Sequence, residues 1–346
     1  MELLSYKDYK WLVIVQRVDT GERFDISRIV HEMTYSTEWM TGAPGTLELL
    51  VVMAPWDDSL AFLTKAHIGA HDKHGHLVQF SIDGEGVFYG YITDVQLDKA
   101  PLMTVTARDQ IFYLKSKDIL YTENMTASDI FTDVCNRKAH LVHRVQSAAG
   151  AILEPHDYKA DSTMFNMIKY AIDWANVLEG TQYMIRDEFG VLVFTELGRL
   201  HTGIRLGDGE YAIDYQYQSS IEGETYNHIK FYRANEEIGM YDTWVAQDSG
   251  TMARWGELGL IVEADKNLTD AEIMGEAQRF LGFYNAPLET LSVSALGRLG
   301  VYAGNGISLD IGRIELAGNF WVTNAKHTFK DCYHAMDLEL YYWAGG

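Results

Sequence analysis

The sequence has little of what stabilises secreted proteins or anchors proteins in membranes. It contains 2 cysteines and 5 prolines in 346 residues. Cys135 and Cys332 lack the spacing of a disulfide framework, which favours a reducing compartment. The N-terminal segment has no basic region followed by a long apolar run, and no apolar run approaches the length of a membrane-spanning helix. We therefore expect a protein that folds in the cytoplasm and does not insert into a membrane by itself.

Basic residues are also scarce. Lysine and arginine number 28 against 49 acidic residues, which gives a net charge of −21. Affinity for duplex nucleic acid comes mainly from cationic side chains, so this balance argues against specific nucleic-acid binding. The acidic surface either keeps a large protein soluble or lines a conduit through which DNA slides without sticking, and composition does not separate these interpretations.

The sequence contains no established catalytic or nucleotide-binding motif. A glycine-rich phosphate loop, a G-x-S-x-G elbow, an H-E-x-x-H pair and an EF-hand loop are all missing. Asp57, Asp58 and Asp173 are examples of carboxylates available for acid–base chemistry, but nothing in their spacing distinguishes them from the other acidic residues. We therefore predict no catalytic, cofactor-binding or metal-ligating residue, and a protein that is not an enzyme.

Two groups of residues imitate reactive or cofactor sites. Cys135 precedes His140 and His143 and so resembles a thiol nucleophile with its base. It borders the apolar stripe of a predicted helix, however, and is better explained as a small buried hydrophobic residue. Met164 and Met167 are likewise interpreted as core filler rather than as part of a cofactor site.

The densest histidine cluster comprises His67, His71, His74 and His76. Imidazoles this close are candidate zinc ligands, and His71 and His74 have the spacing of one helix face. The surrounding glycines and polar residues favour a loop between strands, no second ligand pair follows, and the spacing matches no established zinc signature. Loop and metal site both stay open, and the loop is the preferred interpretation.

What the sequence has in quantity points to β structure. Hydrophobic residues make up 47% of the chain and charged residues 22%, with 21 Tyr and 8 Trp, a composition typical of a folded protein rich in strands. The length suggests two to four domains. The clearest boundary runs from Val105 to Asp129, where alternating apolar residues give way to helical spacing and Thr126 with Asp129 resembles a capping box.

Residues 1–117 are predicted to form a first β-barrel. The β-branched run from Trp11 to Val18 precedes a hairpin turn at 19–22, and Thr46 to Met53 reads as another strand. The segment from Val87 to Leu97 is predicted to be a strand whose side chains point alternately to its two faces. Successive strands with tight turns and no helix are typical of a small antiparallel barrel or sandwich.

Residues 118–200 are predicted to form an α+β module. One amphipathic helix follows Thr126, and a second is capped by Asp161 or Ser162. A hairpin is predicted from Gln182 to Thr195. Helices and hairpin together indicate a compact unit between two strand-rich regions.

Strand patterns return in residues 201–233 and 287–346, which we assign to a second barrel. Residues 234–286 read as a small inserted domain with one helix, capped by Thr269 and Glu272. The predicted fold is therefore mostly β with α+β insertions. Two barrels in one chain suggest an internal duplication, although no convincing residue-level repeat is found.

Six segments, in order along nearly the whole chain, carry a resemblance to one family. They are Val105 to Asp118, Thr126 to Ile130, Tyr183 to Phe194, Ser219 to Arg233, Asp248 to Gly259 and Thr290 to Leu309. Together they resemble the baseplate and tail hub proteins of contractile phage tails and R-type bacteriocins, specifically the XkdQ/YqbQ-like proteins of PBSX-type prophages.

This resemblance implies a homotrimer in which each chain supplies two tube-like β-barrels. The resulting pseudo-hexameric ring joins the hexameric tail tube to the trimeric central spike. The implied partners are the tail tube protein, the central spike protein and the baseplate wedge proteins, with the tape measure protein as a further candidate. The implied location is the bacterial cytoplasm during assembly and then the baseplate of a phage tail or bacteriocin particle.

Two other functions are weighed against a structural hub: a tail-associated cell-wall hydrolase and a carbohydrate-binding module. The missing catalytic motifs argue against the first, and the full-length resemblance argues against the second. A ring subunit should hold open strand edges that pair only on assembly. The tyrosine-rich segment from Tyr211 to Gln218 suits such an edge, and an exposed sheet face explains it equally well.

Overall fold

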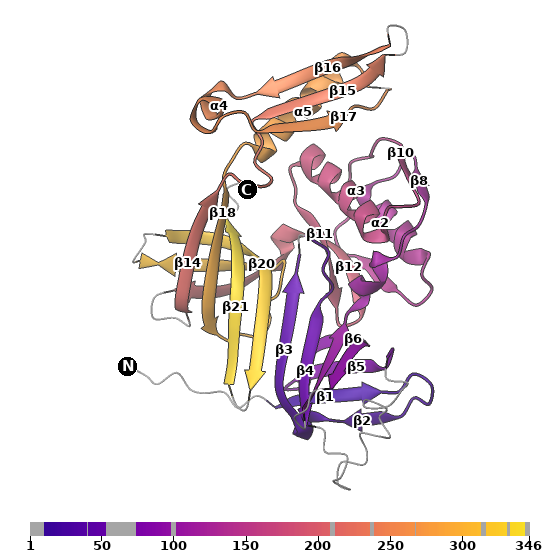
Figure 1. Cartoon of the computed structure of the whole chain (residues 1–346), viewed down its shortest axis with the longest axis vertical. Helices are drawn as coiled ribbons and strands as arrows, with labels where there is room; N and C mark the ends of the chain where they lie inside the picture. The colour runs from indigo at the N-terminus through magenta and orange to yellow at the C-terminus, as the bar shows by residue number, and fades with distance from the viewer. Residues whose placement is uncertain are drawn as a thin grey trace.

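In the computed structural model of the chain, the described residues are 10–39, 41–52, 74–97, 102–207, 212–235, 239–266, 268–312, 316–330 and 333–342. The fold is mostly β, which confirms the predicted class. One long sheet occupies much of the molecule, a helical module covers one side, and a small sheet with its own helix forms one end of the long axis (Figure 1).

The first half of the long sheet comes from the N-terminal third of the chain. Its strands follow the order β3-β4-β7-β6-β5-β1-β2. The predicted hairpin at residues 19–22 is confirmed, because β1 and β2 pair antiparallel. Alternating side chains of this half bury one apolar cluster that includes Phe80 and Phe88. The elements are β1 (Trp11–Gln16), β2 (Arg23–Asp25), η1 (Ser27–Ile29), β3 (Val30–Glu38), β4 (Thr46–Val52), β5 (Leu77–Ile82), β6 (Glu85–Leu97) and β7 (Leu102–Arg108).

The second half follows the order β14-β18-β21-β20, with β19 beside β20 and β13 parallel to β19. The two halves form one sheet because the long strand β20 changes partner along its length: Leu316 to Trp321 pair with β19, and Asn324 to Lys330 pair with β3. The elements are β13 (His201–Gly207), β14 (Ala212–Ser220), β18 (Leu288–Leu296), β19 (Gly306–Ile311), β20 (Leu316–Lys330) and β21 (Tyr333–Tyr342).

The strand order of one half repeats in the other. The order β3-β4-β7-β6-β5 matches β14-β18-β21-β20-β19, and the matched strands also occur in the same order along the chain. Beyond these five strands the halves differ, since β1 pairs antiparallel with β5 whereas β13 pairs parallel with β19. The structure thus shows the duplication that the sequence only suggested.

The α+β module lies between the two halves in sequence. The capping box of Thr126 and Asp129 is confirmed, and so is the predicted hairpin. The second helix, α3, is capped by Thr163 and not by Asp161 or Ser162, because the Thr163 hydroxyl accepts the backbone N–H of Asn166 at 3.1 Å. The elements are η3 (Gln110–Lys115), β8 (Leu120–Thr122), α2 (Ala127–Asn136), β9 (Val142–Val145), β10 (His156–Tyr158), α3 (Met164–Glu179), β11 (Tyr183–Glu188), β12 (Val191–Glu196) and η4 (Leu197–Leu200).

A separate small sheet is built around the strand β15. Strand β15 begins at His228, within residues 201–233 that were assigned above to the second barrel, and it is the central strand of this sheet, where it pairs with β16 and β17. Ile229 and Phe231 are buried there, with the Phe231 ring 5.4 Å from that of Phe280 on α5. The predicted capping box at Thr269 is confirmed. The elements are β15 (His228–Asn235), β16 (Met240–Gln247), α4 (Ser249–Trp255), β17 (Gly259–Glu263) and α5 (Asp270–Tyr284).

Candidate functional site

A pair of buried histidines lies where the two halves of the long sheet meet. His327 Nδ1 lies 2.9 Å from His334 Nε2, and His327 Nε2 lies 2.7 Å from the carbonyl oxygen of Val301. Burial lowers the pKa of His327 to about 4, and burial together with the neighbouring His327 lowers that of His334 to about 3. Both rings are therefore neutral at pH 7.

The hydrogen bonds fix the protons of this pair. A carbonyl only accepts, so His327 donates from Nε2 and its Nδ1 accepts from His334 Nε2–H. The His334 ring also stacks on Phe329 at a centroid distance of 4.1 Å. The pair links β20 to β21 and, through the carbonyl of Val301, to the segment before β19. It has the character of a structural contact rather than of an acid–base site.

A second polar cluster joins the first half of the sheet to the α+β module. Asp109 Oδ2 accepts the N–H of Gly45 at 2.8 Å, and its Oδ1 accepts the N–H of Ile111 at 3.0 Å. Asp187 Oδ1 accepts the N–H of Gly190 at 2.7 Å in the turn between β11 and β12. Burial raises the pKa of Asp109 well above its usual range and that of Asp187 to about 7.

Both carboxylates line a cavity of about 250 Å³ between these parts. The Oδ2 atom of Asp187 is buried in it without a hydrogen-bond partner among the described residues. A perturbed carboxyl in a cavity is typical of catalytic sites and also of structural networks. Asp109 caps η3 with its side chain, which favours the structural interpretation here. Sequence reasoning missed both residues, since an aspartate after a strand or in a turn is common.

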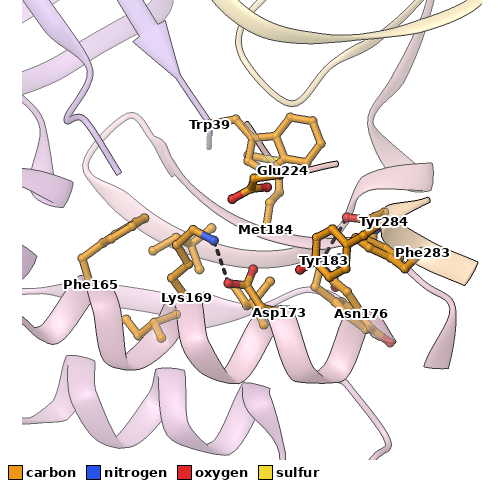
Figure 2. A pocket seen from close by; sticks show the side chains of 14 residues that line it. Trp39, Phe165, Lys169, Asp173, Asn176, Tyr183, Met184, Glu224, Phe283 and Tyr284 are labelled. Atoms are coloured by element: carbon orange, nitrogen blue, oxygen red, sulfur yellow. Dashed lines mark hydrogen bonds and ion pairs between the residues drawn. The ribbon is translucent and has the colours of Figure 1, made fainter. Parts of the chain in front are cut away.

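A smaller pocket of about 100 Å³ lies between α3, β11, Trp39, Glu224 and the end of α5 (Figure 2). Asp173, one of the carboxylates considered above, pairs here with Lys169 at 2.6 Å. Figure 2 shows Glu224 on the opposite wall, beneath the ring of Trp39. Pockets for small organic ligands measure roughly 300–1,000 Å³, so this one is a crevice between modules rather than a sugar site.

Of the remaining candidate residues of the α+β module, Cys135, Met164 and Met167 are buried, whereas His143 is half-buried and His140 is exposed. Cys135 is fully buried, and burial raises the pKa of its thiol to about 12, so it is not a thiolate nucleophile. The ring of His140 contacts Tyr113 at 4.5 Å instead. Met164 and Met167 belong to the helical core, which confirms their interpretation as core residues.

Much of the histidine cluster lies outside the described residues, as do Asp57 and Asp58. This applies to His67 and His71, whereas His74 is exposed and His76 is buried. Across the described part of the chain, no group of three or more His, Cys, Asp and Glu side chains has a metal-binding arrangement. No helix of that part is long and apolar enough to cross a membrane.

Among the described residues, the edges of the long sheet include strand β14 and the end of β6. Among the described strands, β14 pairs only with β18. In the described part of the chain, the end of β6 from Asp94 to Leu97 pairs on one side only, with β7. Of the tyrosine-rich segment, Tyr211 lies outside the described residues and Tyr217 is exposed on the β14 edge. Edges of this kind are templates for pairing with another chain.

A family model described as YQBQ-like matches residues 33–341. No curated protein matches the chain. The fold is similar to that of the tail protein from Neisseria meningitidis MC58, at 14% identity and a TM-score of 0.70, with 97% of each chain covered. It is similar to the prophage MuSo2 43 kDa tail protein from Shewanella oneidensis, at 14% identity and a TM-score of 0.67, covering 96% of this chain and 98% of that one.

A third similar structure is the Escherichia coli c3393 protein, at 12% identity and a TM-score of 0.53, covering 92% of this chain and 75% of that chain. It is described as a component of the type VI secretion system with structural similarity to the T4 bacteriophage tail proteins gp27 and gp5. At these identities the three structures establish the fold that the chain shares with them.

Proposed function

Because the chain belongs to the YQBQ-like family, we propose that it is a structural hub of a contractile tail baseplate. The observation that carries this proposal is the repeated strand order within one long sheet. Three chains with two similar halves present six similar positions around a ring while keeping three-fold symmetry. Such a ring matches a six-fold tube on one side and a three-fold spike on the other.

The proposed partners are the tail tube protein, the central spike protein and the baseplate wedge and tape measure proteins. The likeness of the fold to a type VI secretion component that is described as structurally similar to gp27 and gp5 supports a place beside the spike. Three copies at −21 each give a ring charge of −63, which suits a lumen that DNA crosses without binding. The proposed location is the baseplate of a phage tail or bacteriocin particle, reached after assembly in the cytoplasm.

We propose four units for this hub. Residues 1–117 and residues 201–224 with 287–346 are the two tube-like barrels of the ring, and residues 118–200 are the α+β module. The inserted module then spans 225–286, with its start moved from 234 because β15 belongs to its sheet. The role is non-enzymatic, and neither the buried histidines nor the buried aspartates take part in chemistry.

Light scattering on the purified protein, over a range of concentrations and salt, tests the ring. We expect a particle of three times 39.2 kDa, which gains stability as salt screens the acidic repulsion. Electron microscopy of that particle should show a central hole. A monomer under every condition contradicts a self-assembling ring. Release of peptidoglycan fragments, lost on changing one carboxylate, contradicts the non-enzymatic role.

A further inference from the structure

The two halves repeat their local irregularities as well as their strand order. Strand β6 has a bulge at Thr93, and β20 has one at Thr323. Each threonine hydroxyl donates to a carbonyl of the next strand: Thr93 to Thr106 at 3.4 Å, and Thr323 to Glu339 at 3.0 Å. When the two bulges are matched, the segment YITDVQL, which begins at Tyr91, aligns with the segment WVTNAKH, which begins at Trp321, 230 residues later.

Hydrogen bonds beside the bulges repeat too. The N–H of Gly75 donates to the carbonyl of Ile92 at 2.8 Å, and that of Gly304 to the carbonyl of Val322 at 2.8 Å. Both glycines have a positive φ, of 79° and 86°. A repeat of both geometry and bonding makes residues at matching positions structurally equivalent, so the sheet defines a residue-level alignment.

The same alignment extends to the two edge strands. Strand β3 has a register shift against β4 between Val30 and Glu32, and β14 has one against β18 between Ala212 and Asp214. When the two register shifts are matched, the residues that follow them align one by one, and Tyr35 on β3 is equivalent to Tyr217 on β14. In the same way, Leu97 on β6 is equivalent to His327 on β20.

Inside the chain, β20 and β3 close the junction between the halves. His327 lies directly opposite Tyr35 there, and these residues are only 1% and 6% exposed. Their equivalents have no such cover: Leu97 is 56% exposed and Tyr217 is 45% exposed. The edges that meet within one chain are therefore matched by two edges that have no partner strand among the described residues of the same chain.

We propose that β6 of one copy pairs antiparallel with β14 of the next copy, repeating the β20–β3 junction between subunits. In this register Leu97 lies opposite Tyr217, and Gln96 opposite Gln218. Val95 lies opposite Ser219, and Asp94 opposite Ser220. The occupant of both open edges is thus a second copy of this chain. This inference rests on the proposed ring and names its subunit contact.

Charge and symmetry support this contact. Asp94 is the only charged side chain in the four pairs, which favours association between copies that each carry a charge of −21. The two edges differ, so the contact is head-to-tail, and a head-to-tail contact closes into a ring when its rotation allows. Pairing also satisfies the backbone groups of both edges and covers the apolar surface of Leu97 and Tyr217.

Cross-linking in matched register tests the proposal. Facing Cα atoms in antiparallel strands lie about 4.5 or 5.5 Å apart at alternate pairs, within the range of a disulfide. Two double variants, Leu97→Cys with Tyr217→Cys and Gln96→Cys with Gln218→Cys, cover both kinds of pair. On oxidation we expect covalent dimers and trimers that reductant removes. Leu97→Cys with Gln218→Cys, shifted by one residue onto opposite faces, should stay uncross-linked, as should each single variant.

Charge substitutions at the exposed pair give a second measurement. Leu97→Asp or Tyr217→Lys alone should weaken the trimer roughly tenfold or more, because each buries an unpaired charge at the contact. Combined, they should restore part of the loss. Tyr121→Lys, at an exposed tyrosine of the α+β module, is the matched control and should leave the trimer unchanged.

The outcomes separate this contact from the ring itself. A trimer by light scattering that resists both matched cross-links, or tolerates both charged variants, overturns the β6–β14 contact and leaves the hub proposal standing. An unmodified protein that stays monomeric under every condition overturns the ring and the contact together.

Discussion

His327 and His334 make the junction between the halves sensitive to acid. Their pKa values in the folded protein, about 4 and about 3, lie below the value of about 6.5 in an unfolded chain. The unfolded state therefore binds more protons between pH 6.5 and pH 4, and folding stability falls as the pH falls through this range. The stability that depends on the neutral pair is fully present above pH 6.5.

We predict that the His334→Gln variant loses part of this acid sensitivity. Glutamine still offers an N–H near His327 but no longer titrates. Urea denaturation between pH 4 and pH 7 should give a shallower fall of the unfolding free energy than in the unmodified protein. The exposed His74→Gln variant should reproduce the unmodified slope. Equal slopes in all three proteins would argue against the histidine pair as the source.

Asp187 has the opposite effect on the pH dependence of folding stability. Its pKa is about 7 in the folded protein and about 3.9 in an unfolded chain. The folded state therefore binds more protons over this interval, and stability falls as the pH rises through it. Asp187→Asn should be more stable than the unmodified protein at pH 8, by about 1–3 kcal/mol, and should show little or none of this gain at pH 5. Asp157→Asn, at an exposed carboxylate, should show no such difference between the two pH values.

Sequence patterns located buried residues better than buried polar pairs. Cys135 borders the apolar stripe of its helix, and Met164 and Met167 are of a residue type that commonly fills cores, so all three were predicted to be buried, as they are. Asp109 and Asp187 gave no comparable signal, because a turn aspartate has the same local pattern whether solvent or a second module covers it. Burial is the main cause of the raised pKa values of both carboxyl groups, and it arises where the first half of the sheet packs against the α+β module.

At the scale of elements, local patterns predicted strands and helix caps but not the partner of each strand. Two capping boxes and two hairpins were predicted and are present. The strand β15 was also predicted as a strand, but alternation does not show which sheet it joins. It joins β16 and β17 because Ile229 and Phe231 bury against α5.

The repeat within the long sheet was likewise not evident from local sequence patterns. Tyr91 to Leu97 and Trp321 to His327 share a short pattern with few identical residues. Only their shared bulges and hydrogen bonds make the equivalence evident. A duplication that has kept its backbone geometry while its side chains diverged is visible in a structure before it is visible in a sequence.

At the scale of the whole molecule, the inserted module is separable from the long sheet. Ser220 at the end of β14 lies directly opposite Leu288 at the start of β18, so the module interrupts what is otherwise a hairpin. Its main contact with the body is between α3 and α5, where the rings of Trp174 and Phe280 lie 5.3 Å apart. The proposed β6–β14 contact between subunits involves neither α3 nor α5.

We therefore predict that residues 221–287 can be replaced by Asn-Gly, a dipeptide that favours a two-residue hairpin turn, without loss of the trimer. The variant should unfold at a lower temperature, because the α3 surface around Trp174 loses its cover. Trp174→Gln in the full-length chain is the control for that lost packing and should also trimerise. A folded deletion variant that remains monomeric, beside a trimeric control, would place a necessary subunit contact in the inserted module and not on the β6 and β14 edges alone.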